Sequence, residues 1–362
     1  MTNQSTFIIA EAGVNHNGSL DMALQLVDKA AEAGADAVKF QTFKSEAVIS
    51  RYAVKAEYQK QTTGNDDTQL EMVKRLELDE LAHQKIRDRC VEKGIQFLST
   101  PFDLESLRLL VDKFDLPIIK IPSGEITNAP FLIEIAATGR KLILSTGMSS
   151  LGEIETALGI LAFGALKSGI GPSIEAFRAA FESEEGQALL SERVSLLHCT
   201  TEYPAPVDQV NLNAMNTMRQ AFKLPVGYSD HTKGISISVA AVALGATIIE
   251  KHFTLDRSLP GPDHLASLEP EELLDMVEGI RAVELAIGSS LKIAAPAERA
   301  NKTVARKSLV ALEAIAKGQL FNNNNLGCKR PGGGLSPLYY WDVIGKVADR
   351  DYSEDELIDS LK

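Results

Sequence analysis

Short runs of apolar and β-branched residues alternate with longer segments of helical period between residues 7 and 287. This alternation is typical of a parallel α/β sheet, in which each short run is a strand. Eight runs predict strands: Phe7–Gly13, Ala37–Phe43, Gln96–Phe102, Ile118–Glu125, Lys141–Gly147, Val194–Thr200, Pro225–His231 and Ile248–Thr254.

The segments between these runs predict helices. In Leu20–Ala33, for example, Leu20, Leu24 and Val27 fall on one face, and Gly34 follows as a C-cap. The other predicted helices are Leu78–Lys93, Glu105–Phe114, Leu151–Phe163, Leu212–Phe222, Ile235–Leu244 and Glu269–Ile287. Eight units of strand and helix in a segment of this length predict a (β/α)₈ TIM barrel, an α/β fold.

The rest of the chain predicts a second, smaller domain. Residues 1–287 form the predicted barrel, 288–303 read as a linker, and 304–362 have their own apolar stretches around the turn-rich KRPGGG at 329–334. Within the barrel, residues 165–193 are longer than an ordinary connection and predict an extra helix around Glu175–Phe181.

Composition and charge exclude several classes of protein. The formal net charge of −12, from 37 Lys plus Arg against 49 Asp plus Glu, argues against a nucleic-acid binder. No apolar run is long enough to span a membrane, and residues 1–7 lack the features of a secretory signal. The three cysteines are widely spaced and predict neither disulfides nor a zinc knuckle, so we expect a cytoplasmic protein.

Charged and polar residues stand at the ends of the predicted strands. In a barrel these ends meet at one mouth, so residues far apart in sequence face a common cavity. Helix capping is an equal alternative for Ser99, Thr146 and Asp230. Capping does not suit the four charged residues inside apolar strands, where an unpaired charge is expensive; these are Glu11, Lys39, Lys120 and Glu250.

Two histidines are candidate metal ligands. His231 and His252 are 21 residues apart, which is one strand-and-helix unit, so they stand side by side at neighbouring strand ends. Two imidazoles with nearby carboxylates suit a divalent metal that stays open to substrate. The alternative is a pair of hydrogen-bonded histidines without metal.

Lysines and hydroxyls form a second candidate set. Lys39, Lys120, Ser123, Ser145 and Ser229 suit a doubly anionic ligand that carries a phosphate and a carboxylate. Two alternatives stay open, a Schiff-base lysine and lysines that only pair with glutamates. The sequence contains neither a P-loop nor a GxGxxG motif, so nothing in it predicts a nucleotide cofactor.

One further candidate lies in the predicted small domain. Arg330 in KRPGGG is either part of a lid that reaches an active site or a solvated charge on a turn.

Eleven segments in order resemble the sialic acid synthase family across Ile8 to Ile358. They are IIAEAGVNHNG (8–18), AVKFQTFK (37–44), KAEYQ (55–59), STPFD (99–103), KIPSGE (120–125), LSTGM (144–148), LHCTTEYPAP (197–206), GYSDHT (227–232), IEKHFT (249–254), PGPDHLASLEP (260–270), and ARKSLVA with KRPGGG (305–311 and 329–334). Any one of them is weak evidence, and together they make a chance resemblance untenable.

The resemblance implies a TIM barrel followed by an antifreeze-like (SAF) domain, in a domain-swapped homodimer. It implies that phosphoenolpyruvate condenses with an open-chain N-acylated mannosamine-type sugar to give a nine-carbon 2-keto acid and phosphate. It also implies a divalent metal, Mn²⁺ in the first place, with Mg²⁺ or Co²⁺ as alternatives.

The resemblance also assigns roles to residues. By motif, His231 and His252 match the metal ligands, and Glu11 and Glu250 match acidic catalytic positions near the metal and the aldehyde. The positions that match the phosphoenolpyruvate site are Lys39, Thr100, Lys120, Ser123, Ser145 and Ser229. Those that match sugar-binding positions are Gln41, Tyr203, Asp263 and Arg330.

The acceptor sugar is the least constrained part. The main interpretation is an N-acetylneuraminate synthase that uses N-acetylmannosamine. The alternative is a legionaminate or pseudaminate synthase that uses a 6-deoxy diacetamido hexose, and an alternative of another mechanism is a Schiff-base keto-acid aldolase. Residues 165–193 and Gly333, where many relatives have Asn, are candidates for shaping sugar recognition.

Overall fold

The computed structural model describes residues 5–55, 60, 68–167 and 169–359. Of the segment KAEYQ, only Lys55 lies within these described residues. The chain divides into two compact units, Met1–Gly288 and Ser289–Lys362.

Eight parallel strands form the centre of the first unit. They are β1 Phe7–Gly13, β2 Ala37–Thr42, β3 Gln96–Pro101, β4 Ile118–Ile121, β5 Lys141–Ser145, β6 Val194–Cys199, β7 Val226–Asp230 and β8 Ile248–His252. The strand order is β3-β2-β1-β8-β7-β6-β5-β4, and the two end strands contact each other. The sheet is therefore a nearly closed TIM-type barrel, as the alternation of runs and helical segments predicts.

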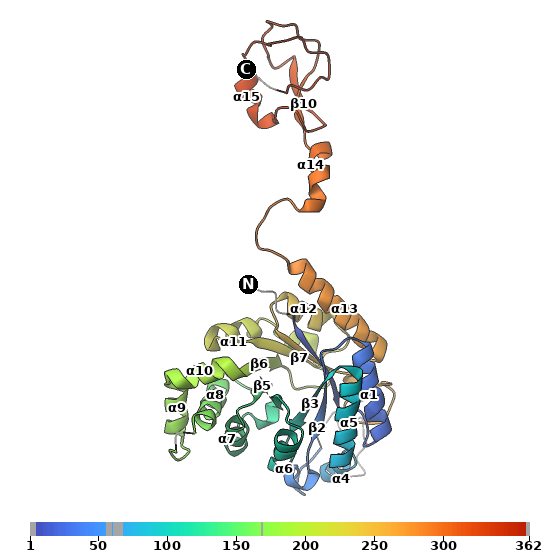
Figure 1. Ribbon diagram of the computed structural model, residues 1–362, viewed down its shortest axis with the longest axis vertical. Coiled ribbons are helices and arrows are strands. Elements are labelled where there is room, and N and C mark those ends of the chain that lie inside the picture. The colour runs from blue at the N-terminus through green and yellow to red at the C-terminus, as the bar shows by residue number, and fades with distance from the viewer. Residues whose placement is uncertain (1–4, 56–59, 61–67, 168, 360–362) are drawn as a thin grey trace. The chain divides into compact units, whose positions relative to one another are not determined.

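Helices cover the outside of these strands (Figure 1). The larger ones are α1 Leu20–Glu32, α5 Glu80–Lys93, α7 Ala129–Ala137, α8 Leu151–Leu166, α11 Ala214–Phe222, α12 Ser236–Ala243 and α13 Pro270–Ile287. The shorter ones are α2 Ser45–Val48, α4 Gln69–Lys74 and α6 Leu104–Arg108, which continues as a π-helical turn over Leu109–Lys113. Among the described residues, no helix combines the length and apolar character that crossing a bilayer requires.

The helix α7 is absent from the helices predicted above. Its sequence, APFLIEIAA, is apolar almost throughout, so it lacks the polar face that marks an amphipathic helix. Its start does carry a signal, because the Asn128 side chain accepts a hydrogen bond from the backbone N–H of Phe131 and Pro130 stands in the first turn.

The long segment 165–193 forms two helices, α9 Ile174–Glu182 and α10 Glu184–Arg193, where one was predicted. Both pack against α8, and the Phe177 ring lies edge-on to Phe163 with centroids 5.2 Å apart. The segment therefore extends the outer helical layer of the barrel.

The second unit is built on a small antiparallel sheet of β9 Ser308–Ala311 and β10 Leu326–Lys329. It also holds two short helices, α14 Arg299–Ala305 and α15 Tyr340–Val343. Its own apolar core includes Leu309, Ile315, Phe321, Leu326, Val343, Tyr352 and Ile358. The helix α14 runs across the predicted boundary between residues 303 and 304.

Candidate active site

The interior of the barrel is arranged in layers that follow the two-residue period of its strands. The lower layer is an apolar cluster of Ile9, Ala37, Leu98, Ile143, Leu197 and Ile248. Two residues further along the same strands stand Glu11, Lys39, Thr100, Ser145, Cys199 and Glu250, and all six line one cavity. The barrel therefore places a polar and charged layer directly above an apolar plug.

Strand β7 contributes a glycine, Gly227, to the lower layer. A Cβ atom on Gly227 would lie 2.4 Å from the backbone oxygen of Ile248 and 2.8 Å from Cδ2 of Leu197. Glycine at this position lets β7 pass close to its neighbours in the lower layer. Ser229, two residues on, then reaches the polar layer beside Glu250, its register partner on β8.

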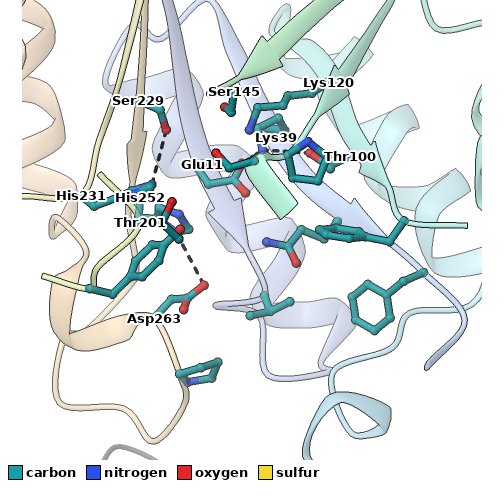
Figure 2. A pocket seen from close by; sticks show the side chains of 18 of the residues that line it. Glu11, Lys39, Thr100, Lys120, Ser145, Thr201, Ser229, His231, His252 and Asp263 are labelled. Carbon is teal, nitrogen blue, oxygen red and sulfur yellow. Dashed lines mark hydrogen bonds and ion pairs between the residues drawn. The ribbon is translucent and has the colours of Figure 1, made fainter. Parts of the chain in front are cut away.

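The cavity at the mouth of the barrel has a volume of about 290 Å³ (Figure 2). Thirteen of the fourteen site residues predicted from the sequence line it. They are Glu11, Lys39, Gln41, Thr100, Lys120, Ser123, Ser145, Tyr203, Ser229, His231, Glu250, His252 and Asp263. Arg330 belongs to the second unit, where its Nε donates a hydrogen bond to the carbonyl of Ala305 at 2.9 Å. The individual roles of all fourteen residues stay predictions.

Two lysines and two glutamates form a buried charge network at the base of the cavity. Lys39 Nζ lies 2.7 Å from Glu11 Oε2 and 3.5 Å from Glu250 Oε2. Lys120 Nζ donates a hydrogen bond to Glu250 Oε1 at 2.9 Å, and Ser229 Oγ donates to the same oxygen at 2.9 Å. The opposite charges compensate one another, which explains how four ionisable groups lie inside apolar strands.

The two glutamates differ in acidity although both are buried. Burial raises the pKa of Glu11 to about 7, because it outweighs the attraction of Lys39. Burial also opposes the ionisation of Glu250, but the charges of Lys120 and Lys39 prevail and hold the pKa of that carboxyl below its ordinary value. Glu250 is therefore a fixed anion, and Glu11 can exchange a proton near neutral pH.

The two histidines meet at the side of the cavity, with ring centroids 5.6 Å apart. Tyr203 holds both, since its ring lies 4.2 Å from that of His231 and edge-on to His252 at 5.6 Å. The His231 Nδ1–H donates to the Thr200 carbonyl at 2.6 Å, which leaves a lone pair on Nε2. Burial lowers the pKa of His231 to about 4 and that of His252 well below its usual value, so both rings are neutral at pH 7.

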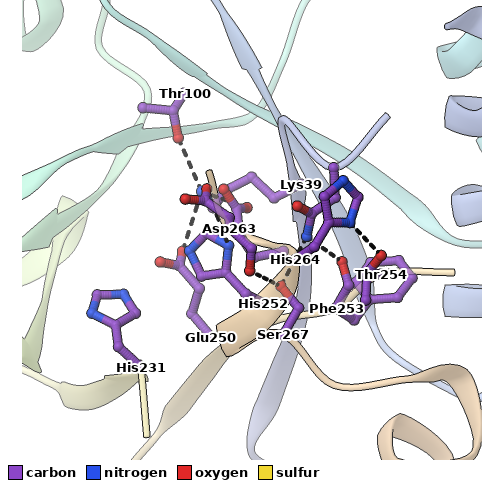
Figure 3. A network of polar contacts seen from close by, with 12 residues as sticks. Lys39, Thr100, His231, Glu250, His252, Phe253, Thr254, Asp263, His264 and Ser267 are labelled. Carbon is purple, nitrogen blue, oxygen red and sulfur yellow. Dashed lines mark hydrogen bonds and ion pairs between the residues drawn. The ribbon is translucent and has the colours of Figure 1, made fainter. Parts of the chain in front are cut away.

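Asp263 faces His252, with 3.8 Å between Oδ2 and Nδ1, and burial raises its pKa to about 6. A chain of hydrogen bonds holds the loop that carries it (Figure 3). Asn15 Nδ2 donates to the Phe253 carbonyl at 2.8 Å and to Ser267 Oγ at 2.9 Å, and Ser267 Oγ donates to the Asp263 carbonyl at 2.7 Å. The end of β8 and this loop are thus tied to the loop after β1.

Three polar residues with an alternative capping role lie outside this cavity. Ser99 Oγ hydrogen-bonds to Thr42 Oγ1 at 2.7 Å, and Thr146 Oγ1 donates to the Leu197 carbonyl at 2.9 Å. Asp230 accepts from Thr232, and none of the three side chains caps a described helix. They alternate with cavity residues along their strands and serve the packing behind them.

Several residues of the cavity are not among those predicted from the sequence. Cys199 and Thr201 continue the alternation that starts at Leu197 and reaches Tyr203, so the period of two along β6 was a usable signal. The Thr201 hydroxyl is buried and makes no hydrogen bond with any described residue. Residues 165–193 were candidates for shaping sugar recognition, but none of the described ones lines the cavity.

Comparison with known proteins identifies the family. The model of the NeuB family matches residues 26–292, and that of the SAF domain matches residues 306–359. The chain is 52% identical over 355 residues to the N,N'-diacetyllegionaminic acid synthase of Campylobacter jejuni, covering 98% of this chain and 99% of the relative. It is 43% identical to the Legionella pneumophila protein of the same name, covering 95% and 90%.

A solved structure agrees with these matches. It is the N-acetylneuraminic acid (sialic acid) synthetase of Leptospira borgpetersenii, with a TM-score of 0.65 and 34% identity, covering 83% of this chain and 90% of that one. The resemblance inferred from the eleven segments is thereby confirmed. The chain belongs to the NeuB family of sialic-acid-type synthases and is an enzyme that forms carbon–carbon bonds.

Proposed function

We propose that the protein condenses phosphoenolpyruvate with 2,4-diacetamido-2,4,6-trideoxymannose to give N,N'-diacetyllegionaminic acid and phosphate. The observation that carries this proposal is the 52% identity, over nearly the full length of both chains, to a relative named for that product. The N-acetylneuraminate interpretation has weaker support, because the sialic acid synthetase structure is 34% identical. The relatives thus favour the alternative acceptor, the 6-deoxy diacetamido sugar, over N-acetylmannosamine.

The charged base of the cavity suits phosphoenolpyruvate. Lys39 and Lys120 supply two cations for its phosphate and carboxylate, and hydroxyl groups surround them. Those of Thr100, Ser123, Ser145 and Ser229 line the same cavity, and Ser145 Oγ is buried without a hydrogen-bond partner among the described residues. An unpartnered buried hydroxyl favours a ligand that accepts its hydrogen bond.

The residues present fit a divalent metal. His231 and His252 are neutral imidazoles, and the buried Nδ1 of His252 makes no hydrogen bond with a described residue. Within the described ranges no three His, Cys, Asp or Glu side chains converge as a complete metal cage, so the two imidazoles would hold an ion that keeps positions open for water and substrate. Such an ion, when bound, supplies Lewis-acid polarisation of the sugar's aldehyde oxygen.

The residues of this chain support the reaction in three ways. Lys39 and Lys120 hold phosphoenolpyruvate so that its C3 faces the aldehyde carbon. The new carbon–carbon bond forms there as the aldehyde π bond opens and its oxygen takes up one proton. Water then adds to C2 and loses a proton, for which Glu11 is the better acceptor, since its pKa of about 7 lies near the working pH. Phosphate leaves by cleavage of the C2–O bond and takes the proton of the new C2 hydroxyl, which becomes the keto group. Glu250 keeps Lys120 oriented.

Gln41, Tyr203 and Asp263 would bind the polar groups of the sugar, and Arg330 its N-acyl group. The domain-swapped dimer that the resemblance implies is part of this proposal, and light scattering of the purified protein tests whether the protein is a dimer. If Arg330 serves the reaction, Arg330→Ala raises KM for the sugar and leaves KM for phosphoenolpyruvate unchanged.

Phosphate release from phosphoenolpyruvate with Mn²⁺ tests the proposal, with mass spectrometry of the product. The 6-deoxy diacetamido sugar and N-acetylmannosamine are compared, each with and without EDTA. We expect EDTA-sensitive release that prefers the diacetamido sugar. Preference for N-acetylmannosamine would restore the neuraminate interpretation, and release from neither sugar by folded, metal-loaded protein would refute the proposal.

A further inference from the structure

The cavity changes from charged to apolar along two neighbouring strands. On β2 and just beyond it, Lys39, Gln41 and Phe43 all line the cavity at intervals of two residues. On β3 and just beyond it, Thr100 and Phe102 do the same. A strand rises by about 3.3 Å per residue, so Lys39 and Phe43 are about 13 Å apart along the strand. The anion-binding base and the outer end of the cavity therefore differ in chemistry.

The outer end is an apolar wall made of Phe43, Val48, Ile49, Met72, Val73 and Leu76. The wall comes from the end of β2, from α2 with the residue after it, and from α4 with its following turn. Phe43 and Leu76 pack in one buried cluster, joined by Val48 and Val73. The Phe43 ring is held edge-on to that of Phe102, with centroids 6.2 Å apart. The wall is thus a fixed surface with its own core.

Packing within this cluster leaves part of the apolar surface of the wall exposed to the cavity. Val48, Ile49 and Val73 are only partly buried and turn part of their apolar surface to the cavity. Apolar surface facing water in an enclosed site gains free energy when an apolar group of a ligand covers it. None of these side chains can accept or donate a hydrogen bond.

Under the proposed function, the reaction limits which part of the acceptor can lie far from the charged base. The aldehyde carbon C1 must meet phosphoenolpyruvate at the charged base, so in an open-chain hexose C6 points to the other end of the cavity. The two candidate acceptors differ there, since C6 is a methyl group in the 6-deoxy sugar and carries a hydroxyl in N-acetylmannosamine. A hydroxyl packed against these described apolar side chains loses its water, and none of them can form a hydrogen bond with it.

We propose that the apolar wall binds the C6 methyl group of the acceptor and makes the enzyme selective for 6-deoxy sugars. This inference rests on the proposed function and names the residues that set its substrate class. An apolar pocket discriminates against an added hydroxyl by about 100-fold. We therefore expect kcat/KM for the 6-deoxy diacetamido sugar to exceed that for the same sugar with a 6-hydroxyl by about that factor.

The test uses two acceptors that differ only at C6, 2,4-diacetamido-2,4,6-trideoxymannose and 2,4-diacetamido-2,4-dideoxymannose. Phosphate release gives kcat/KM for each with wild-type protein and with the double variant Val48→Thr/Ile49→Thr. These residues are partly buried, and threonine keeps the branched shape of the side chain. We expect the preference for the 6-deoxy sugar to fall about tenfold or more, through KM for the sugar, with KM for phosphoenolpyruvate unchanged.

Val207→Thr is the matched control, because Val207 is 60% exposed and does not line the cavity. It should keep the wild-type preference. Wild-type protein that turns over both acceptors equally, or a folded double variant with an unchanged preference, would overturn the inference and leave the proposed function standing. Absence of release from both acceptors would instead refute the proposed function and, with it, this inference.

Discussion

Lys251 and Asp230 form an ion pair that is closed to solvent, with 3.0 Å between Nζ and Oδ2. They are register partners on β8 and β7. Asp230 lies between two cavity residues, Ser229 and His231, and Lys251 holds the equivalent place on β8. Asp230 also accepts hydrogen bonds from Thr232 and from Ser238 of α12. The pair therefore anchors, from behind, the two strands that carry the histidines.

Removing one partner of this pair should destabilise the barrel strongly. In Lys251→Met the Asp230 carboxylate stays buried without its cation, and we expect the free energy of unfolding to fall by about 3–5 kcal/mol. Urea unfolding followed by circular dichroism at 222 nm measures this. Fluorescence reports the other unit, because Trp341 is the only tryptophan.

Lys29→Met provides the control for this measurement. Lys29 forms an exposed pair with Glu32 on α1, 2.7 Å from Nζ to Oε2. An exposed pair of this kind contributes little to the free energy of unfolding, because solvent and salt screen it. Equal losses from Lys29→Met and Lys251→Met would show that burial gives the Lys251 pair no special weight.

Lys120 should be required for turnover. Lys120→Met removes a cation that we place against phosphoenolpyruvate, and loss of one such preorganised group costs about 10²–10³ in rate. Steady-state phosphate release measures the effect. Lys44→Met is the control, since Lys44 pairs with Glu77 at 3.4 Å and does not line the cavity.

Borohydride trapping tests whether a lysine of this protein forms a Schiff base. A Schiff-base aldolase would form an imine between a lysine and pyruvate, which borohydride reduces to a stable adduct. We expect the mass of the intact wild-type protein to stay unchanged after treatment with pyruvate and borohydride. An adduct on Lys39 or Lys120 would contradict the proposed mechanism and favour the aldolase.

Much of the barrel and its cavity is legible in the sequence because both follow a period of two. Glu11 stands two residues after Ile9 of the apolar plug, and Thr100 two residues after Leu98. The alternation along each strand therefore identifies the residues that face the barrel interior. A charge inside an apolar run, as at Lys39, marks the position as functional because its burial is costly. These signals are local and need no knowledge of the rest of the fold.

The parts that escaped prediction depend on contacts that no local pattern records. The helix α7 is apolar on nearly every face, so its period is hidden. The apolar wall comes partly from α4, whose Met72 and Val73 read as ordinary core residues until the fold brings them to the cavity. Whether residues 165–193 face the site or the outer layer was likewise decided by packing against α8.

Metal binding should depend on the two cavity histidines, His231 and His252, and not on His198, which lies outside the cavity. Loss of a residue that only orients a metal ligand weakens metal binding by about 10–100-fold. We expect His231→Ala and His252→Ala, which each remove a ligand, to weaken Mn²⁺ binding by more than that. The electron paramagnetic resonance signal of free Mn²⁺ measures binding independently of activity.

His198→Asn is the matched control for metal binding. His198 lies on β6, and its ring nitrogen Nε2 hydrogen-bonds to the Val210 carbonyl at 2.7 Å, outside the cavity. This variant should bind Mn²⁺ as the wild type does. Unchanged binding in both cavity variants would mean that the ion is held elsewhere.

His83 should make the stability of the barrel sensitive to acid. Its Nδ1–H donates to the Asp79 carbonyl at 2.9 Å, and its Nε2 accepts from Thr42 Oγ1 at 2.9 Å. Burial lowers the pKa of His83 in the folded protein. Its neutral ring therefore contributes stability that is present above the unfolded pKa of about 6.5 and is lost as pH falls toward the folded pKa.

The variant His83→Gln tests this pH dependence. In wild-type protein the unfolded state binds up to one more proton than the folded state at this site, which costs up to about 1.4 kcal/mol per pH unit below pH 6.5. Without that site, the free energy of unfolding should fall less steeply between pH 7.5 and pH 5.5 in urea titrations. Thr42→Val removes the hydroxyl partner but not the titrating ring, so it should lower stability and keep the wild-type slope. If the free energy of unfolding falls with pH equally steeply in wild type and His83→Gln, the acid sensitivity comes from other groups. The reason is that His83→Gln removes the proton uptake of this ring.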